Sequence, residues 1–197
     1  MRLLVPTPSD DQTLPDAAVV ARARAGAPDA LSRLFERYGE MTYRVAYRLT
    51  ASAADAEDVL QDVFVGLPEA LRGFEGRGSL EGWLKRVVVR TALMRLRGER
   101  RRREVRLGDA GGDDAGRGGP EPAAPRRDDP SRVLDEMAIG DALAALPQPL
   151  REVFVLREVE GYSHDEIGAL LGIRRGTSEV RLFRARQALR EMLRGSL

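Results

Sequence analysis

Cysteine is absent from the 197-residue chain, and histidine occurs only once. These absences exclude disulfide bonds, thiol catalysis, thiolate zinc sites and histidine-rich metal sites. The sequence also contains no phosphate-binding glycine loop, no nucleophile elbow and no metalloprotease helix. We therefore expect no catalytic residues, no metal, no cofactor and no small-molecule substrate. The single histidine, His164, falls in the first turn of an expected helix, where we interpret it as a surface residue.

Long apolar runs and an excess of one charge are lacking as well. The longest apolar runs, such as 87–89, fall far short of the roughly 20 residues that span a bilayer. The apolar stretch near the N-terminus is too short for a secretory signal. We expect a soluble intracellular protein with no membrane insertion. Because 32 basic residues face 31 acidic ones, a nucleic-acid partner must be argued from where the charges lie.

Glycine, proline and acidic residues concentrate in residues 107–130. No apolar face exists there to offset the entropy of ordering, so we predict a flexible acidic linker. Residues 1–15 have a similar composition and are predicted to be a disordered tail. Between and beyond them lie two helical blocks, 16–106 and 131–197, with no strand-like alternation. The predicted fold is all-α, with two small helical domains joined by the linker.

Amphipathic helices with a period of three to four residues account for the first block. One helix begins near Asp55, which we expect to cap it, and ends at Pro68. The loop 73–79 then leads into a further helix. The expected buried faces are Leu31, Leu34, Phe35, Tyr38, Val45 and Leu49; then Ala56, Val59, Leu60, Val63, Phe64 and Leu67; then Leu80, Trp83, Leu84, Val87, Val88 and Thr91.

The second block contains a predicted helix-turn-helix. Ser163 and Glu166 have the spacing of a capping box, and Gly172 is suited to end the short helix that follows. A longer, arginine-bearing helix then runs to about Arg194. Its core side is expected to be Ser178, Leu182, Ala185 and Leu189. The residues expected to face DNA are Arg174, Arg175, Thr177, Glu179, Val180, Phe183 and Arg184.

Charge is strongly segregated along the chain. Residues 95–106 hold seven arginines and two glutamates, and residues 174–194 hold the same numbers, so each segment has a net charge of +5. Residues 55–62 carry four acidic side chains and no basic one. Two basic surfaces on separate domains suit a long polyanion, because each phosphate contact releases counterions. The alternative for each run is an ordinary solvated helix face.

A second stripe runs along the helix that begins near Asp55, separate from its buried face. Its members are Asp58, Gln61, Asp62 and Val65, at spacings of three and four residues. We interpret this stripe as a docking face for a basic protein partner, with solvent exposure alone as the alternative. Trp83 is interpreted as a core residue, with contact to an unstacked base as the alternative.

Several segments, taken in order, resemble one protein family. They are AEDVLQDVF (56–64), GSLEGWLKRVV (78–88) and the stretch from ALPQPL to REML (145–193). The chain resembles the extracytoplasmic-function (ECF) sigma factors of bacterial RNA polymerase. The resemblance implies a protein of the bacterial cytoplasm that binds core polymerase and directs promoter-specific initiation. It also implies that the protein performs no chemistry itself and is regulated by an anti-sigma factor.

The resemblance assigns a partner to each surface. The stripe of Asp58, Gln61, Asp62 and Val65 would dock on the clamp helices of the largest polymerase subunit, and the second domain on the flap of the second-largest subunit. The helix-turn-helix would read the minus-thirty-five element. The loop 73–79 and the following helix would melt and read the minus-ten element, opening the duplex at roughly 1–2 kcal/mol per base step. The candidate contacts there are Arg77, Ser79, Trp83, Arg86, Arg90, Arg97 and Arg100.

Some residues depart from the family pattern. Arg90 and Met94 stand where asparagine and a carboxylate are usual, and Gly168, Ser178 and Glu179 stand where alanine, an apolar residue and a basic residue are usual. The promoter sequence therefore cannot be transferred from a relative. Two alternatives differ in class. One is a stand-alone helix-turn-helix regulator, and the other is an arginine-rich RNA-binding or structural protein.

Overall fold

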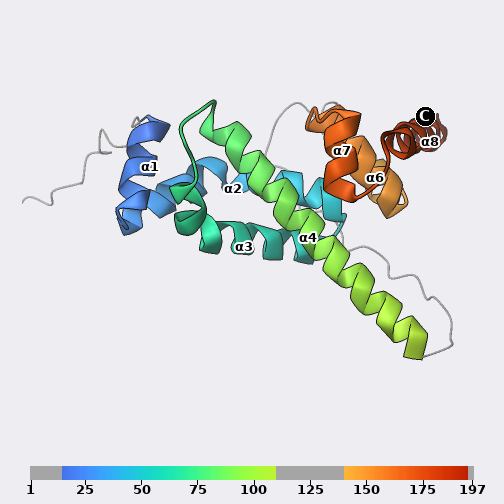
Figure 1. Ribbon diagram of the computed structural model, residues 1–197, viewed down its shortest axis with the longest axis horizontal. Helices are drawn as coiled ribbons and strands as arrows, with labels where there is room; N and C mark the ends of the chain where they lie inside the picture. Colours follow the sequence, from blue (N-terminus) through green and yellow to red (C-terminus); the bar gives the residue numbers. More distant parts are fainter. Residues whose placement is uncertain (1–14, 110–139, 195–197) are drawn as a thin grey trace, which may run out of the picture.

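The computed structural model describes residues 15–109 and 140–194, which are helical and contain no strand (Figure 1). This confirms the expected all-α class. The first domain consists of α1 (Asp16–Arg24), α2 (Pro28–Thr50), α3 (Ala53–Arg72) and α4 (Leu80–Asp109). The second consists of a helical segment over 140–145, α6 (Gln148–Phe154), the π-helix η2 (Val155–Val159), α7 (His164–Leu171) and α8 (Arg175–Arg194).

The core of the first domain forms where α2 packs against both α3 and α4, while α1 lies against α2 and α3. Most of the expected buried faces are confirmed, with Leu34, Leu49, Val59 and Leu84 almost fully buried. Phe35 was expected in this core but is 48% exposed. It lies at the rim of the α2–α3 interface, where its ring meets the ring of Phe64 at 5.0 Å in an edge-on contact.

Both predicted ends of α3 were wrong. Ser52, not Asp55, caps the helix, because the Ser52 hydroxyl accepts a hydrogen bond from the Asp55 amide at 3.3 Å. Pro68 lies inside the helix, which continues to Arg72. A proline removes one backbone hydrogen bond, but the buried Leu67 and Leu71 on either side hold the last turns in the core.

Helix α4 is 30 residues long and ends at Asp109. The first three residues of the predicted linker, 107–109, therefore belong to this helix. The rest of that linker, the expected start of the second domain over 131–139 and the tail over 1–14 lie outside the described residues. In Figure 1 the last turns of α4 project away from both domains.

The helix-turn-helix forms as expected. The Ser163 hydroxyl accepts from the Glu166 amide at 3.2 Å, and the Glu166 carboxylate accepts from the Ser163 amide at 2.8 Å, which confirms the capping box. Gly172 ends α7 in the left-handed region, with φ of 68°. The π-helix η2 was not predicted. It forms where the Glu160 amide donates to the Val155 carbonyl at 3.0 Å.

The two domains share an interface centred on Arg151, a side chain that is only 7% exposed. Its Nε donates to the Leu49 carbonyl at 3.1 Å and its Nη2 to the Thr50 carbonyl at 3.2 Å, both at the end of α2. Its Nη1 donates to the carbonyls of Ala144 and Leu146, each at 3.0 Å. The last carbonyls of a helix lack helical partners and carry partial negative charge, so a guanidinium stabilises them. Arg151 therefore ties the second domain to the first.

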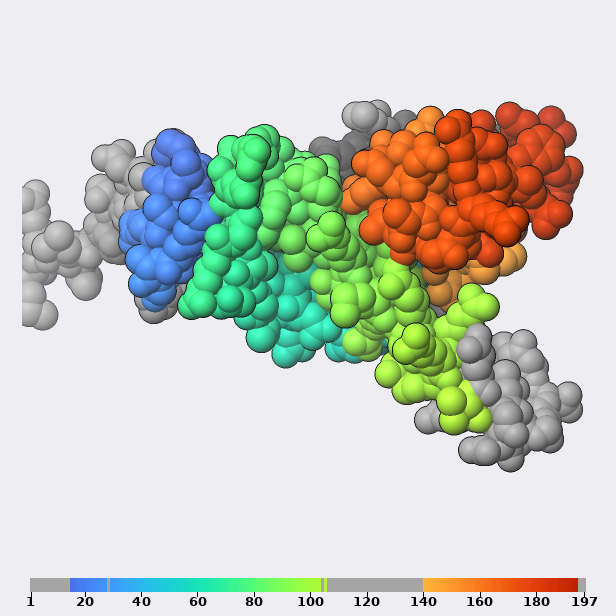
Figure 2. All heavy atoms as spheres, in the orientation of Figure 1, coloured from blue at the N-terminus to red at the C-terminus, as the bar shows by residue number. Residues whose placement is uncertain are grey.

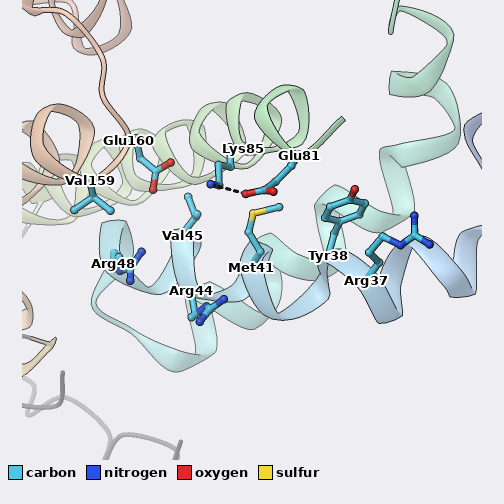
Figure 3. A pocket seen from close by; sticks show the side chains of 10 residues that line it. All are labelled: Arg37, Tyr38, Met41, Arg44, Val45, Arg48, Glu81, Lys85, Val159 and Glu160. Atoms are coloured by element: carbon cyan, nitrogen blue, oxygen red, sulfur yellow. Dashed lines mark ion pairs between the residues drawn. The ribbon is translucent and has the colours of Figure 1, made fainter. Parts of the chain in front are cut away.

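Apolar and charged contacts extend this interface. Val153, Leu156 and Ile167 of the second domain belong to the same buried cluster as the first-domain core. Beside them lies a cavity of about 420 Å³ between α2, the start of α4 and the end of η2. Figure 3 shows Glu160 projecting into this space toward Lys85 and Arg48. Burial raises the pKa of Glu160, and these two cations oppose the rise.

Candidate nucleic-acid interface

The outward face of the helix-turn-helix is formed by the residues that the sequence predicted. Ser178, Leu182, Ala185 and Leu189 of α8 are buried against the rest of the second domain. All seven predicted DNA-facing side chains are exposed; they are Arg174, Arg175, Thr177, Glu179, Val180, Phe183 and Arg184. Phe183 is 68% exposed and Val180 is 51% exposed. Two apolar side chains are thus presented among cations at the start of the recognition helix.

The corner between α7 and α8 requires a glycine. A Cβ atom on Gly168 would stand 2.8 Å from the carbonyl oxygen of Ile173, closer than such contacts occur. The Ile173 amide in turn donates to the Gly168 carbonyl at 3.0 Å. The departure from the alanine that the family resemblance predicts therefore has a steric cause, namely the close approach of the turn to α7.

His164 is half-buried and is not the simple surface residue that we expected. Its Nδ1 lies 2.9 Å from the hydroxyl of Ser178, which is fully buried in α8. The hydrogen bond satisfies a polar group at a position where the family resemblance predicts an apolar residue. The two residues form one pair across the α7–α8 contact. Because they lie on different helices, no periodicity in the sequence could have paired them.

The cations of the recognition face are not equivalent. Arg175 forms ion pairs with Glu179 at 2.9 Å and with Asp165 at 3.3 Å. The hydrogen bond from Arg175 lowers the pKa of Glu179, so this carboxylate stays charged and remains paired with Arg175. Arg174 and Arg184 form no ion pair with any described residue. These two guanidinium groups are therefore the ones available to an anionic ligand.

The predicted docking stripe lies on the exposed side of α3. Asp58, Gln61, Asp62 and Val65 are all exposed, and Val65 is 76% exposed. The opposite side of α3 is buried in the first-domain core. The structure thus places two carboxylates, an amide and an apolar side chain on one exposed face of α3. Such a face is complementary to a partner surface that carries basic side chains around an apolar one.

Arg95 belongs to the basic run 95–106 but points toward α3. Its Nε lies 3.0 Å from Asp55 Oδ1 and 3.6 Å from Glu99 Oε1, and its Nη2 pairs with Asp58. Burial alone would raise the pKa of Asp55, but hydrogen bonds from Arg95 and Ser52 outweigh it and lower that pKa. Burial and the nearby Asp55 raise the pKa of Glu99. The basic run is therefore not one surface, and its first arginine holds a carboxylate of the docking stripe.

The loop before α4 and the first turn of α4 carry three of the predicted minus-ten contacts. Arg77 is exposed and pairs with Glu75. The Ser79 hydroxyl accepts from the Gly82 amide at 3.1 Å, so it caps the first turn of α4. Trp83 is half-buried, and its ring lies 5.3 Å from that of Phe74. The open side of Trp83 remains available to a ligand, Arg77 is exposed but paired with Glu75 within the loop, and the Ser79 hydroxyl is engaged.

The remaining minus-ten candidates, Arg86, Arg90, Arg97 and Arg100, are exposed on α4. The second domain lies against the middle of this helix (Figure 2). Arg97 donates from Nη2 to the carbonyl of Leu170 in α7. Burial raises the pKa of Tyr162, whereas Arg86 and Arg90 lower it, which places that phenol beside them. Part of the basic face of α4 is therefore in contact with the helix-turn-helix domain.

Within residues 15–109 and 140–194, no helix has the length and apolar character needed to cross a membrane. The same ranges contain no group of three or more histidine, aspartate and glutamate side chains arranged to hold a metal ion.

The chain is similar in sequence to known proteins over both of its domains. Residues 34–102 match the Sigma-70 region 2 family and residues 136–189 match Sigma-70, region 4. The ECF RNA polymerase sigma factor SigE of Mycolicibacterium smegmatis is 33% identical over 191 residues, covering 94% of this chain and 70% of SigE. RNA polymerase sigma factor CarQ of Myxococcus xanthus is 34% identical over 172 residues, covering 87% and 94%. The ECF sigma-E factor of Escherichia coli K12 is 31% identical over 181 residues, covering 90% and 94%.

Two solved structures are similar in fold. The sigma factor RpoE in complex with the anti-sigma factor NepR from Bartonella quintana superposes with a TM-score of 0.57 at 24% identity, covering 83% of this chain and 96% of RpoE. CnrH in complex with the cytosolic domain of CnrY gives a TM-score of 0.50 at 26% identity, covering 92% and 99%.

Proposed function

The chain belongs to the ECF sigma factors of bacterial RNA polymerase, which direct transcription initiation, and we propose a role for each of its exposed faces in that activity. The observation that carries the proposal is that both predicted contact sets are exposed and lie on separate helices. The docking stripe occupies α3, and the seven DNA-facing residues occupy the start of α8 and the residue before it. Polymerase and promoter can therefore bind at the same time.

Core polymerase binds the docking stripe through the clamp helices of its largest subunit. Asp62 and Gln61 supply acceptors for basic side chains, and Val65 supplies an apolar contact at the C-terminal end of the stripe. Asp58 also faces the clamp helices, and its ion pair with Arg95 partly neutralises its negative charge. The second domain binds the flap of the second-largest subunit.

The helix-turn-helix reads the minus-thirty-five element. Arg174 and Arg184 bind phosphates or the acceptor atoms of guanine, and Val180 and Phe183 contact thymine methyl groups in the major groove. The Arg175–Glu179 pair sets the register of these residues at the start of the helix. Held by Arg175, Glu179 repels the DNA backbone less than an unpaired carboxylate would.

The loop before α4 and the basic face of α4 open and hold the minus-ten element. Arg77 and Trp83 engage an unstacked base, while Arg86, Arg90, Arg97 and Arg100 neutralise the backbone. Because Arg97 donates to the Leu170 carbonyl, the second domain covers part of this face of α4, and backbone binding there is favoured when the second domain leaves it. Polymerase binding supplies the competing contacts that separate the domains.

The other partner is an anti-sigma factor, since RpoE and CnrH were each solved with a second protein bound. A protein that covers the α3 stripe or the faces of α4 and α8 would block polymerase or promoter binding. We place the protein in the bacterial cytoplasm, where its polymerase and promoter are. It acts without chemistry of its own, because polymerase forms the phosphodiester bonds.

The docking assignment is tested with Asp62→Arg, which reverses the charge of one of the two carboxylates of the stripe but leaves the Arg95 cluster intact. We expect polymerase binding to fall by at least about tenfold, since like charges brought together at an interface cost several kcal/mol. The matched control is Glu40→Arg, a charge reversal at an exposed position on a different helix, α2. Affinity is measured with labelled full-length protein and core polymerase, and run-off transcription from a promoter library gives the activity. Equal affinities for the two variants would refute the assignment.

A stand-alone helix-turn-helix regulator is not favoured, because the match extends over the first domain as well as the second. The same experiment separates the two functions. A regulator of that kind binds its operator tightly without polymerase, whereas the proposed sigma factor binds promoter DNA weakly until core enzyme is added. An arginine-rich RNA-binding protein would bind regardless of DNA sequence, with affinity set by salt alone.

A further inference from the structure

Helix α1 makes a contact that the proposed function does not use. Arg24, in its last turn, donates from Nε to the Leu71 carbonyl at 2.9 Å and from Nη2 to the Phe74 carbonyl. These acceptors lie 47 and 50 residues further along the chain. Leu71 lies in the last turn of α3, and Phe74 is the second residue of the loop 73–79 that leads to α4. A side chain from the N-terminal helix therefore holds the point where α3 becomes the loop.

The loop has few other attachments at this end. Its amides over 75–78 form no backbone hydrogen bond within the described residues, and Gly76 and Gly78 have positive φ. The ion pair between Arg77 and Glu75 is internal to the loop. At the far end, Ser79 caps α4. At the start of the loop, the Phe74 amide donates to the Leu71 carbonyl at 3.1 Å and the Phe74 ring is buried in the core beside Trp83. Arg24 adds a charged side-chain link from another helix to this same point.

Helix α1 is itself anchored firmly enough to serve as a support. Val19, Val20 and Ala23 are buried against α2 and α3. At its first residue, Asp16 accepts from the Tyr38 hydroxyl and from Arg37, each at 2.6 Å. Burial, together with this bond to Asp16, raises the pKa of Tyr38 to about 12, so the phenol keeps its proton and continues to donate. A guanidinium on such a helix restrains the carbonyls that it binds.

We propose that Arg24 is a positioning residue for promoter opening, acting through the Phe74 carbonyl to hold the loop that carries Arg77 and leads to Trp83 in the first turn of α4. The inference rests on the proposed function of that loop. It adds a residue that neither touches the DNA nor belongs to the docking stripe. The planar fork of a guanidinium bonds both carbonyls at once, whereas a lysine keeps the charge but lacks the fork, and a glutamine carries no charge.

The experiment compares Arg24→Gln with Arg24→Lys and with Arg22→Gln. Arg22 lies on the same helix and pairs with Asp29 at 2.5 Å, so its variant removes a surface ion pair without touching the loop. Trp83 is the only tryptophan in the chain and packs on Phe74. Its emission and its quenching by acrylamide therefore report on the start of the loop in the free full-length protein.

In Arg24→Gln we expect stronger quenching of Trp83 and an approximately tenfold drop in promoter opening, because charge-assisted hydrogen bonds of this kind are each worth about that factor. Opening is measured by permanganate reactivity of unpaired thymines with core polymerase present. Polymerase affinity should match that of Arg22→Gln, and Arg24→Lys should recover part of the loss. Quenching and opening equal to those of Arg22→Gln would overturn the proposal, and so would an equal loss of polymerase binding.

The two proposals fail in different ways. If the natural protein itself opens no promoter with core polymerase, the function of the loop is wrong. The Trp83 measurement still decides whether Arg24 holds the loop, because it requires neither DNA nor polymerase.

Discussion

Arg151 of the second domain donates from Nε to the carbonyl oxygen of Leu49, at the end of a first-domain helix and 102 residues away in sequence. The same guanidinium holds carbonyls of its own domain. One buried cation therefore stabilises the start of the second domain and its attachment to the first.

Replacing Arg151 with methionine should lower the free energy of unfolding by at least about 3 kcal/mol, because several buried carbonyls lose their donor at once. The radius of gyration from solution scattering should also rise as the domains separate. Arg157→Met is the control, since Arg157 is exposed and donates a single bond, to the Tyr162 carbonyl. Urea unfolding measures both variants, and equal midpoints would contradict the role of Arg151.

Gly168→Ala should destabilise the protein by about 1–3 kcal/mol, the usual cost of overpacking, because the added methyl group meets a backbone oxygen that cannot move aside. Gly176→Ala provides the comparison. A Cβ there has nothing within 4 Å, and Gly176 lies in the first turn of α8. It should be neutral or stabilise by up to about 1 kcal/mol through helix propensity. Thermal unfolding followed by circular dichroism decides, and a neutral Gly168→Ala would disprove the steric explanation.

Leu182 and Phe183 are neighbours with opposite expected effects. Leu182 is 6% exposed, so Leu182→Ala should cost about 2–5 kcal/mol in stability. Phe183 is 68% exposed, so Phe183→Ala should change stability by less than about 0.5 kcal/mol while weakening recognition of the minus-thirty-five element. Unfolding midpoints and promoter affinity in the presence of core polymerase test the pair. A large stability loss in Phe183→Ala would show that its ring belongs to the core.

The Arg95 cluster predicts that two carboxylates respond differently to pH. The folded state lowers the pKa of Asp55, so its contribution to stability is present above its ordinary pKa and disappears as the pH falls through the folded value. The folded state raises the pKa of Glu99, so the charged form disfavours folding once the pH rises past that raised value.

At pH 7, Asp55→Asn should therefore lower the melting temperature by a few degrees, and Glu99→Gln should leave it unchanged or raise it. Below pH 4 the difference between Asp55→Asn and the natural protein should shrink. Melting curves between pH 3 and pH 8 measure both effects. If both variants are destabilised equally at pH 7, the assignment of the two shifts is wrong.

Local spacing in the sequence was enough to predict the capping box of Ser163 and Glu166, the helix end at Gly172, the buried side of α8 and the exposed stripe on α3. Each depends on residues within a few turns of one helix, where a period of 3.6 residues decides which side chains share a face. The same rules misplaced the start of α3 and the side chain of Phe35. Ser52 caps α3 in place of Asp55, and Phe35 is partly exposed because it lies at the rim of the α2–α3 interface.

Only the tertiary structure decided which charges and polar groups meet. Arg95, the first arginine of the basic run 95–106, pairs with Asp55 and Asp58. His164 hydrogen-bonds to Ser178, and Arg24 donates to a carbonyl in the last turn of α3. Each of these side chains is long or polar, and each finds its partner on another helix. The physical reason is that a guanidinium or an imidazole binds whichever acceptor the packing of helices brings within about 3 Å, and no periodicity in one segment encodes that distance.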